Sequence, residues 1–456
     1  RDLHRVDRRQ RQMCIRDRHI TDLNNHVLTI DGGTLQVGYN TSNTVTKIQN
    51  GTLIVGSNNL TDIYIGYNTS ISNARNNIAI FTGTFDSCNL RHLAIGYYNG
   101  SSSKAAGGIL DLRNALIKTL SANNKLLIKG NLSIARGASS IETFGRLYLP
   151  ASLKNLIVSN VYIGYGSRTD GIIDFGNNSS LTNFTILGDF ACAVYARTGR
   201  LVNLPSKTAI SIGSPAQKKN FTLGVCSDDG AQNILSYISL TNGAFNGWIN
   251  NMIIGQHLGG NAGRVDAKLD LRNATVKFNN ILNYVNLNSL YIGVKSVPPT
   301  SRGAESIKGS LYFPNSVTNI TVGTLAISTA NNSSGFLGIG SNSSLSSLTI
   351  TNALYLGGCG IIGYEKAGTF IHYLPAGISI NLGSPSQFIP LYLGYRDANQ
   401  YPYYWETHTN GSGKLIVSNG TFNAYISTFY IGTKEDSTKT MVGILDIRSS
   451  TMKNFL

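Results

Sequence analysis

Four aspartates recur in one short motif, an acidic residue between two large apolar residues, and they are the first candidates for chemistry. They are Asp111, Asp174, Asp270 and Asp446. Glycosidases use two carboxylates about 5 to 10 Å apart. If the motifs stack as parallel strands, the strand of Tyr148 lies between Asp111 and Asp174, which places these two carboxylates roughly 10 Å apart.

An ion pair is the competing use of these carboxylates. An arginine follows three of the aspartates by two residues, so both side chains lie on one face of a strand. The pairs are Asp111–Arg113, Asp270–Arg272 and Asp446–Arg448. We therefore expect no catalytic residue, and we keep Asp174 or Asp270 as the acid of an alternative enzyme, a polysaccharide lyase or hydrolase.

Tyrosines occupy a second recurrent motif, apolar-Tyr-apolar-Gly, in which the ring faces away from the two apolar neighbours. They are Tyr64, Tyr162, Tyr291, Tyr355, Tyr392 and Tyr430. Further tyrosines follow the glycine of this motif at Tyr39, Tyr67, Tyr97, Tyr165 and Tyr395. Two interpretations stay open. The rings stack and support a strand face, or they form a flat amphipathic strip that meets sugars or a partner protein.

The segment 396–408 concentrates aromatic residues between two such motifs. It contains Tyr401, Tyr403, Tyr404 and Trp405. Aromatic residues in a loop on a rigid scaffold are typical of binding sites. The alternative is that they cover a patch of the hydrophobic core.

Other kinds of site have little support. Charged residues are only 13% of the chain, and the formal charge of +15 is dispersed. We therefore expect no nucleic-acid partner. The cysteines Cys88, Cys192, Cys226 and Cys359 are scattered, so we expect small core residues, with no metal and no cofactor. No run of 18 apolar residues occurs, and we expect no membrane span in this sequence.

A long internal repeat indicates which elements hold these residues. Gly145-Arg-Leu-Tyr-Leu-Pro150 returns as Gly309-Ser-Leu-Tyr-Phe-Pro314, and Ile210-Ser-Ile-Gly-Ser-Pro215 returns as Ile380-Asn-Leu-Gly-Ser-Pro385. Such matches indicate a duplicated block of about 160 to 177 residues, which is typical of repeat architectures.

Each block divides into coils of three strand signals with glycine or asparagine at the corners. The pattern predicts an all-β fold, a right-handed parallel β-solenoid of about a dozen triangular three-strand coils. Coils are expected to begin near Gly108, Gly145, Gly171, Gly199, Leu235, Ala267, Gly309, Gly335, Gly368, Gly413 and Gly443. An irregular leucine-rich-repeat array is the alternative fold.

The signals Ile63-Tyr-Ile-Gly-Tyr67 and Gly108-Ile-Leu-Asp-Leu112 resemble the repeats of bacterial secreted and surface β-solenoids, of the autotransporter-passenger and PEP-CTERM-associated types. Leu149-Pro-Ala-Ser-Leu153 is more weakly similar to BspA-type leucine-rich repeats, whose shorter period this chain does not keep. The resemblance implies a secreted or cell-surface protein of the outer membrane or cell wall. It also implies an adhesin or structural spacer that binds a host or microbial glycan or a surface protein.

Residues 1–18 stand apart from the repeats. Arg8-Arg-Gln-Arg-Gln-Met-Cys-Ile-Arg-Asp-Arg18 resembles the conceptual translation of a sequencing-library adapter. We expect this segment to be a disordered artefact and both ends of the natural protein to be missing, with no coil before Leu28. Residues 19–456 are then one solenoid, with large repeats at about 19–107, 108–266 and 267–442 and an incomplete repeat at 443–456.

Overall fold

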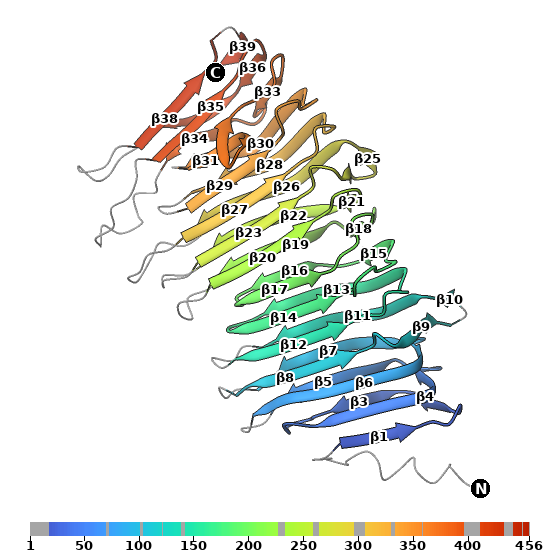
Figure 1. The fold of residues 1–456 in the computed structure, drawn as a ribbon. Helices are drawn as coiled ribbons and strands as arrows, with labels where there is room; N and C mark the ends of the chain where they lie inside the picture. Colours follow the sequence, from blue (N-terminus) through green and yellow to red (C-terminus); the bar gives the residue numbers. More distant parts are fainter. Residues whose placement is uncertain are drawn as a thin grey trace.

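The chain is a long stack of β-strands in which successive turns of the backbone lie on one another (Figure 1). The computed structural model describes residues 18–69, 73–100, 104–120, 122–137, 142–226, 233–258, 264–295, 306–329, 333–357, 359–395, 411–432, 441–448 and 450–455. These residues contain strands and no helix. The strands pair in parallel from coil to coil, so the predicted parallel β-solenoid is confirmed.

The first strand of each coil builds one face of the solenoid. Twelve of them pair in a single sheet: β1 (Arg18–Asp22), β4 (Val45–Val55), β6 (Ala74–Asp86), β8 (Ala106–Asp111), β12 (Thr143–Tyr148), β14 (Thr169–Asp174), β17 (Thr198–Val202), β20 (Asn233–Ser239), β23 (Arg264–Asp270), β27 (Ser306–Tyr312), β29 (Ser333–Gly338) and β31 (Gly360–Lys366). Two more, β35 (Gly411–Ile416) and β38 (Met441–Asp446), pair with each other. With a spacing of about 4.8 Å per coil, fourteen strands span about 60 Å.

The second and third strands of each coil close the rest of the circumference. Separate second strands are β2 (Val27–Ile30), β9 (Ala115–Thr119), β15 (Asn183–Ile186), β18 (Ala209–Ile212), β21 (Ala244–Gly247), β24 (Thr275–Phe278), β33 (Ser379–Leu382), β36 (Thr421–Ala424) and β39 (Thr451–Phe455). Separate third strands are β3 (Gly33–Val37), β5 (Thr61–Asn68), β7 (Leu90–Tyr98), β16 (Phe190–Val194), β19 (Lys219–Cys226), β22 (Ile249–His257), β34 (Ile389–Tyr395) and β37 (Ile426–Ile431).

Neighbouring strand signals merge in several coils. The second and third signals form one strand in β11 (Lys125–Arg136), β13 (Asn155–Tyr165), β26 (Tyr284–Lys295), β28 (Asn319–Ile327) and β30 (Ser347–Gly357). The pairing register shifts within such strands, for example between Ile128 and Asn131, because a bulge takes up the bend of the missing corner.

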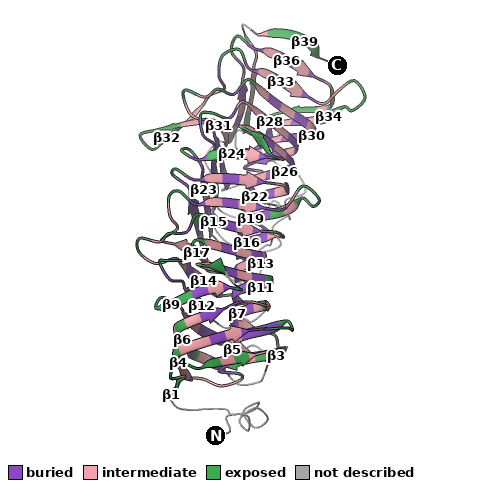
Figure 2. Cartoon of the chain, turned by 90° about the vertical axis from the view of Figure 1, so that its right-hand side faces the viewer, coloured by how far each residue is buried: buried purple, intermediate pink, exposed green. Residues whose placement is uncertain are grey.

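Buried residues recur along the stack of strands (Figure 2), and their side chains form one hydrophobic core that continues from coil to coil. Leu110, Leu147 and Ile173 occupy one rung position on three successive first strands, and each is fully buried. Phe190 and Phe221 stack with ring centroids 5.0 Å apart on successive third strands. Each coil therefore depends on its neighbours for burial of its inner face.

Glycines allow the backbone to turn and to approach itself closely after the third strand. Gly164 is the penultimate residue of β13 and has a φ of 58°, in the left-handed region. A Cβ on the facing first-strand residue Gly171 would lie 2.4 Å from the Gly164 backbone nitrogen. Ala135, Ala193 and Ser328 take the same left-handed conformation at the ends of other third strands, with φ values of 53°, 53° and 56°. The glycine pattern missed these three corners.

The internal repeat reappears as repeated local structure. The antiparallel hairpin of β9 with β10 (Ala122–Asn123) recurs as β24 with β25 (Ile281–Leu282). An isolated bridge joins Ser214 to Gln217, and another joins Ser384 to Gln387. Equivalent sequences in the two blocks therefore adopt equivalent turns.

Two expectations about coil positions were wrong. No coil begins at Gly368, because Gly360 pairs with Gly335 and Gly368 lies in the turn between β31 and β32 (Thr369–His372). The solenoid also begins before Leu28, since β1 starts at Arg18 and pairs in register with β4. Residues 1–17 lie outside the described residues.

Candidate functional site

The third strands carry one continuous outward ladder that contains all six predicted tyrosines. In coil order the ladder reads Gln36, Tyr64, Ala94, Ser133, Tyr162, Ala191, Thr222, Ile253, Tyr291, Ala326, Tyr355, Tyr392 and Tyr430. The register thus places these tyrosines on one face of the solenoid. Only the last three are consecutive, because alanine, serine, threonine and isoleucine residues separate the others.

Tyrosine rings stack where they are adjacent. The Tyr392 ring lies 4.7 Å from the Tyr355 ring and 5.0 Å from the Tyr430 ring, with interplanar angles of 9° in both pairs. Rings this close cannot be coplanar, so they lie face to face along the stack. The stacked rings share their faces with one another on the outward side of the third strands.

A second group of stacked rings follows the corner glycines near the first coils. Tyr67 lies 5.7 Å from Tyr39, 4.7 Å from Tyr64 and 5.4 Å from Tyr97, with interplanar angles of 28° or less. Burial, followed by the nearby Asp62 carboxylate and the neighbouring phenols, raises the pKa of Tyr64 to about 12. Tyr64 therefore stays a neutral hydrogen-bonding group at physiological pH.

Arg136 interrupts this tyrosine row. It pairs with Tyr97 in the preceding coil and with Tyr165 in the following one. Its guanidinium carbon lies 4.3 Å from the ring centroid of Tyr162, 5.3 Å from that of Tyr165 and 5.8 Å from that of Tyr97. Tyr162 and Tyr165 meet edge to face at 75°, so the parallel stacking ends here.

An apolar cluster continues the same face beyond Arg136. Ala191, Val194 and Val225 point outward yet are only 3 to 7% exposed. Larger side chains of neighbouring coils shelter them, among them Tyr162, Tyr165, Tyr195, Ile253 and Leu258. The outer face of the third strands is therefore a rigid surface of aromatic and small apolar groups.

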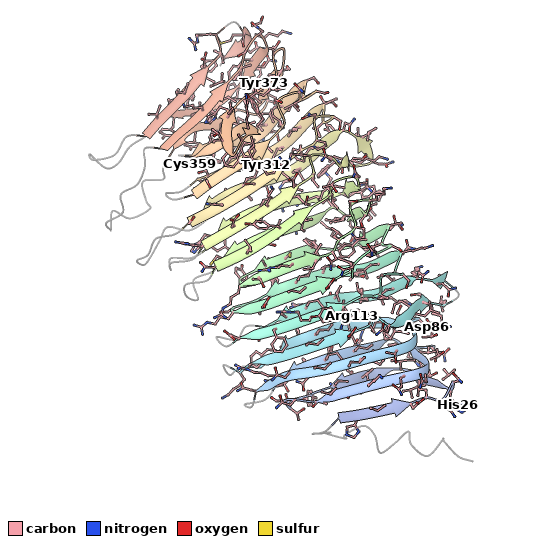
Figure 3. All side chains as sticks on the ribbon, viewed as in Figure 1. His26, Asp86, Arg113, Tyr312, Cys359 and Tyr373 are labelled. Atoms are coloured by element: carbon pink, nitrogen blue, oxygen red, sulfur yellow. The ribbon has the colours of Figure 1, made fainter. Side chains whose placement is uncertain are left out.

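The aspartates form the ion pairs that the spacing predicts. Arg113, which is labelled in Figure 3, donates to Asp111 from Nε at 3.0 Å and from Nη2 at 2.6 Å, and Arg272 holds Asp270 in the same way. Burial alone would raise the pKa of Asp270, but the hydrogen bonds from Arg272 prevail and lower it. A catalytic acid needs the opposite shift.

A cluster on the outer face of the first strands escaped the sequence analysis. The Tyr312 hydroxyl donates to Glu365 Oε2 at 2.9 Å, and the Arg272 guanidinium carbon lies 4.5 Å from the Tyr312 ring centroid. Phe336 joins Tyr312 to Phe370 of β32, with centroid separations of 5.2 and 4.4 Å. Burial and then Glu365 raise the pKa of Tyr312. The aromatic and ionic groups satisfy one another, which indicates a structural role for the cluster.

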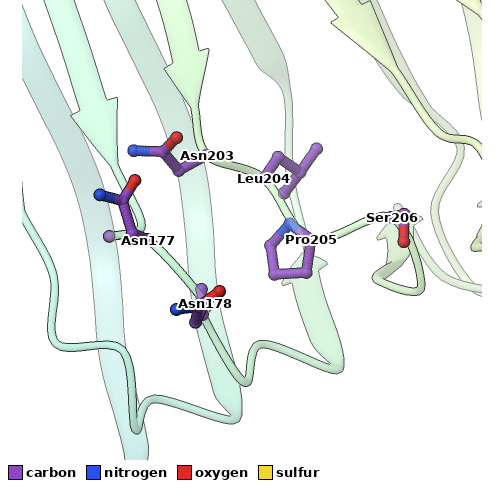
Figure 4. A pocket seen from close by; sticks show the side chains of 8 residues that line it. Asn177, Asn178, Asn203, Leu204, Pro205 and Ser206 are labelled. Carbon is purple, nitrogen blue, oxygen red and sulfur yellow. The ribbon is translucent and has the colours of Figure 1, made fainter.

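A shallow depression of about 440 Å³ lies between the turns that follow β14 and β17 (Figure 4). Asn177, Asn178 and Asn203 line it together with Leu204 and Pro205. Asn203 Nδ2 donates to Asp174 Oδ1 at 2.8 Å, and the Gly176 amide donates to the same oxygen at 2.9 Å. Asp174 thus lies beside an amide-rich depression, and its rung neighbours are Tyr148 and Val202.

The cysteines are core residues in two of the four cases. Cys192 and Cys226 are fully buried, and burial raises the pKa of Cys192 to about 12. Cys88 is partly exposed and Cys359 is exposed, so the expectation was wrong for these two. The reason for Cys359 is its place in the turn immediately before β31. The described residues contain no cluster of three or more potential metal ligands.

Two further expectations concern the aromatic segment and membrane-spanning helices. The aromatic segment with Tyr401, Tyr403, Tyr404 and Trp405 lies outside the described residues. Within the described ranges there is no helix with the length and apolar character to cross a membrane.

No protein family, no curated protein and no solved structure matches this chain.

Proposed function

We propose that this chain is an exported β-solenoid of the cell surface or secreted space, which acts as an adhesin or structural spacer. The outer face of its third strands is the proposed surface for a glycan or protein partner. We call this face the tyrosine surface, because it carries the ladder tyrosines and the tyrosines that follow the corner glycines. The observation that carries the proposal is the ladder of outward tyrosines on a rigid parallel scaffold.

Rigidity supports a role in recognition. Backbone hydrogen bonds hold the paired third strands in register. Stacking then holds several of the rings against one another. A partner would therefore bind side chains that are already ordered, which lowers the entropic cost of association. Tyrosine edges and hydroxyl groups offer apolar contact area and hydrogen bonds in one surface.

The proposal is tested by binding to panels of plant, mucin and microbial polysaccharides and of surface proteins. Tyr39 and Tyr430 are each 40% exposed and belong to the tyrosine surface, whereas Tyr237 is 44% exposed on β20 of the first-strand face. Loss of binding in Tyr39→Ser with Tyr430→Ser, together with full binding in Tyr237→Ser, supports the proposal. Equal loss in both variants, or no ligand in any panel, contradicts it.

A second candidate function is cleavage of a polysaccharide, with Asp174 as the acid. The depression beside Asp174 favours it, because amide groups there could hold sugar hydroxyls. Release of reducing or unsaturated ends that is lost in Asp174→Asn but retained in Asp446→Asn would establish this function and displace the first proposal.

A further inference from the structure

We infer that Arg136 is the anchor of a carboxylate-binding subsite, so that the ligand class of the tyrosine surface is a carboxylated glycan. This inference rests on the proposed function. It narrows the partner of that surface from glycans or proteins in general to glycans that carry uronic acids.

The position of the Arg136 charge is unusual for this surface. A second row lies three residues after the ladder positions and consists of Tyr67, Tyr97, Arg136, Tyr165 and Val194 in successive coils. Arg136 is thus a cation at a position that is aromatic or apolar in the two coils before it and the two coils after it. It is partly exposed, and it forms no ion pair among the described residues, whereas Arg91, Arg113 and Arg272 each hold an aspartate.

The tyrosine rings orient the Arg136 guanidinium group. The guanidinium group lies over the Tyr162 ring at 4.3 Å, with Tyr165 and Tyr97 within 6 Å. Rings against the flat side of a guanidinium leave its N–H edge as the part that donates hydrogen bonds. That edge matches the two oxygens of a carboxylate.

The strand pairing and the surface around Arg136 favour a glycan over an acidic peptide. Backbone groups of β11 already pair with β7 on one side and β13 on the other, so no strand edge is open there for an added peptide strand. The neighbouring surface offers phenol hydroxyls and apolar ring edges, which suit the hydroxyl groups and C–H faces of sugars. A row of residues one coil apart, about 4.8 Å, also suits an extended polymer along the stack.

The test measures the binding of the full chain to hyaluronan and to alginate, each beside its carboxyl-reduced, neutral form. We expect binding to at least one acidic polymer and much weaker binding to its reduced form. Arg136→Gln should weaken binding to the acidic polymer by roughly tenfold or more. Arg136→Lys should also weaken it, because an ammonium group lacks the planar fork.

Arg200→Gln is the matched control, since it removes the same charge from an exposed position on β17 of the first-strand face. It should retain wild-type binding at fixed salt. If Arg200→Gln and Arg136→Gln lose the same affinity, binding follows net charge and the inference fails. Thermal denaturation of each variant shows that the fold is intact.

The possible outcomes also distinguish this inference from the proposed function on which it rests. Equal binding of acidic and reduced polymers, still abolished in the Tyr39 and Tyr430 variants, keeps the tyrosine surface and overturns the Arg136 subsite. Binding of an acidic protein but of none of the four polymers overturns the inference in favour of a peptide carboxylate. Absence of any ligand in these assays and in the wider panels overturns both.

Discussion

Gly171 of a first strand lies against Gly164 at the corner of the preceding third strand, so closely that a Cβ on Gly171 would stand 2.4 Å from the Gly164 nitrogen. Gly309 and Gly293 repeat this contact, with a corresponding distance of 2.3 Å. The coil closes this tightly because Gly171 has no side chain at this point.

Gly171→Ala should therefore destabilise the fold by about 1 to 3 kcal/mol, the usual cost of overpacking a tight site. Gly368→Ala is the control, because no atom lies within 4 Å of a Cβ there and only its positive φ of 78° opposes the change. Its cost should be about 1 kcal/mol. Chemical denaturation measures both, and an equal loss in the two variants would argue against the close contact.

Asp270→Asn should lower stability at pH 7 by about 1 to 3 kcal/mol, since it leaves Arg272 without its carboxylate. The folded-state pKa of Asp270 lies below its unfolded value. Its stabilisation is present above about pH 4 and is lost as the pH falls through the folded-state pKa.

Denaturation from pH 7 to pH 2 checks this dependence. The wild-type protein should lose more stability than Asp270→Asn between about pH 4 and pH 2. Asp446→Asn is the matched control, because Arg448 is 89% exposed and that ion pair is screened by solvent. Parallel acid limbs for the wild type and Asp270→Asn would refute the prediction.

Tyr392→Ala should cost about 1 to 3 kcal/mol, because Tyr392 is the central ring of a stack and each ring pair contributes about 0.5 to 1.5 kcal/mol. Tyr291→Ala should cost less, since the ladder neighbours of Tyr291 are Ile253 and Ala326 rather than tyrosines. Urea midpoints compare the two variants. A larger loss in Tyr291→Ala would show that ring stacking does not stabilise this face.

Much of the architecture follows from local patterns in the sequence. Strict alternation places Tyr64 outward between Ile63 and Ile65, which are fully buried. The spacing of Asp111 and Arg113 on one strand gives their ion pair. Such features depend on only a few neighbouring residues, so the sequence alone predicts them.

Other features depend on contacts between distant residues. Arg136 escaped notice because its corner residue, Ala135, adopts a φ of 53° without being glycine, which hides the coil from the motif. The Tyr312 cluster needs the β31–β32 hairpin, which brings Glu365 and Phe370 to the first-strand face. The hairpin also explains why Gly368 does not begin a coil.

The aromatic segment 396–408 supplies a separate prediction. Replacement of Tyr403, Tyr404 and Trp405 by Ala should weaken ligand binding by about 1 to 2 kcal/mol if these residues contact a partner. Stability should then stay nearly unchanged, since no core packing is lost. A stability loss of several kcal/mol would instead mean that the rings cover the core, because each buried aromatic contributes about 3 to 5 kcal/mol.

The most direct test of the tyrosine surface is chemical protection by a bound ligand. Tetranitromethane nitrates exposed tyrosines, and mass spectrometry of the digested protein reports the extent at each position. Tyr39 and Tyr430 are 40% exposed and Tyr237 is 44% exposed, so all three should react in the free protein. With ligand bound, we expect protection on the third-strand face, with Tyr237 still reactive. Protection of Tyr237 with unchanged reaction at Tyr39 and Tyr430 would contradict the account.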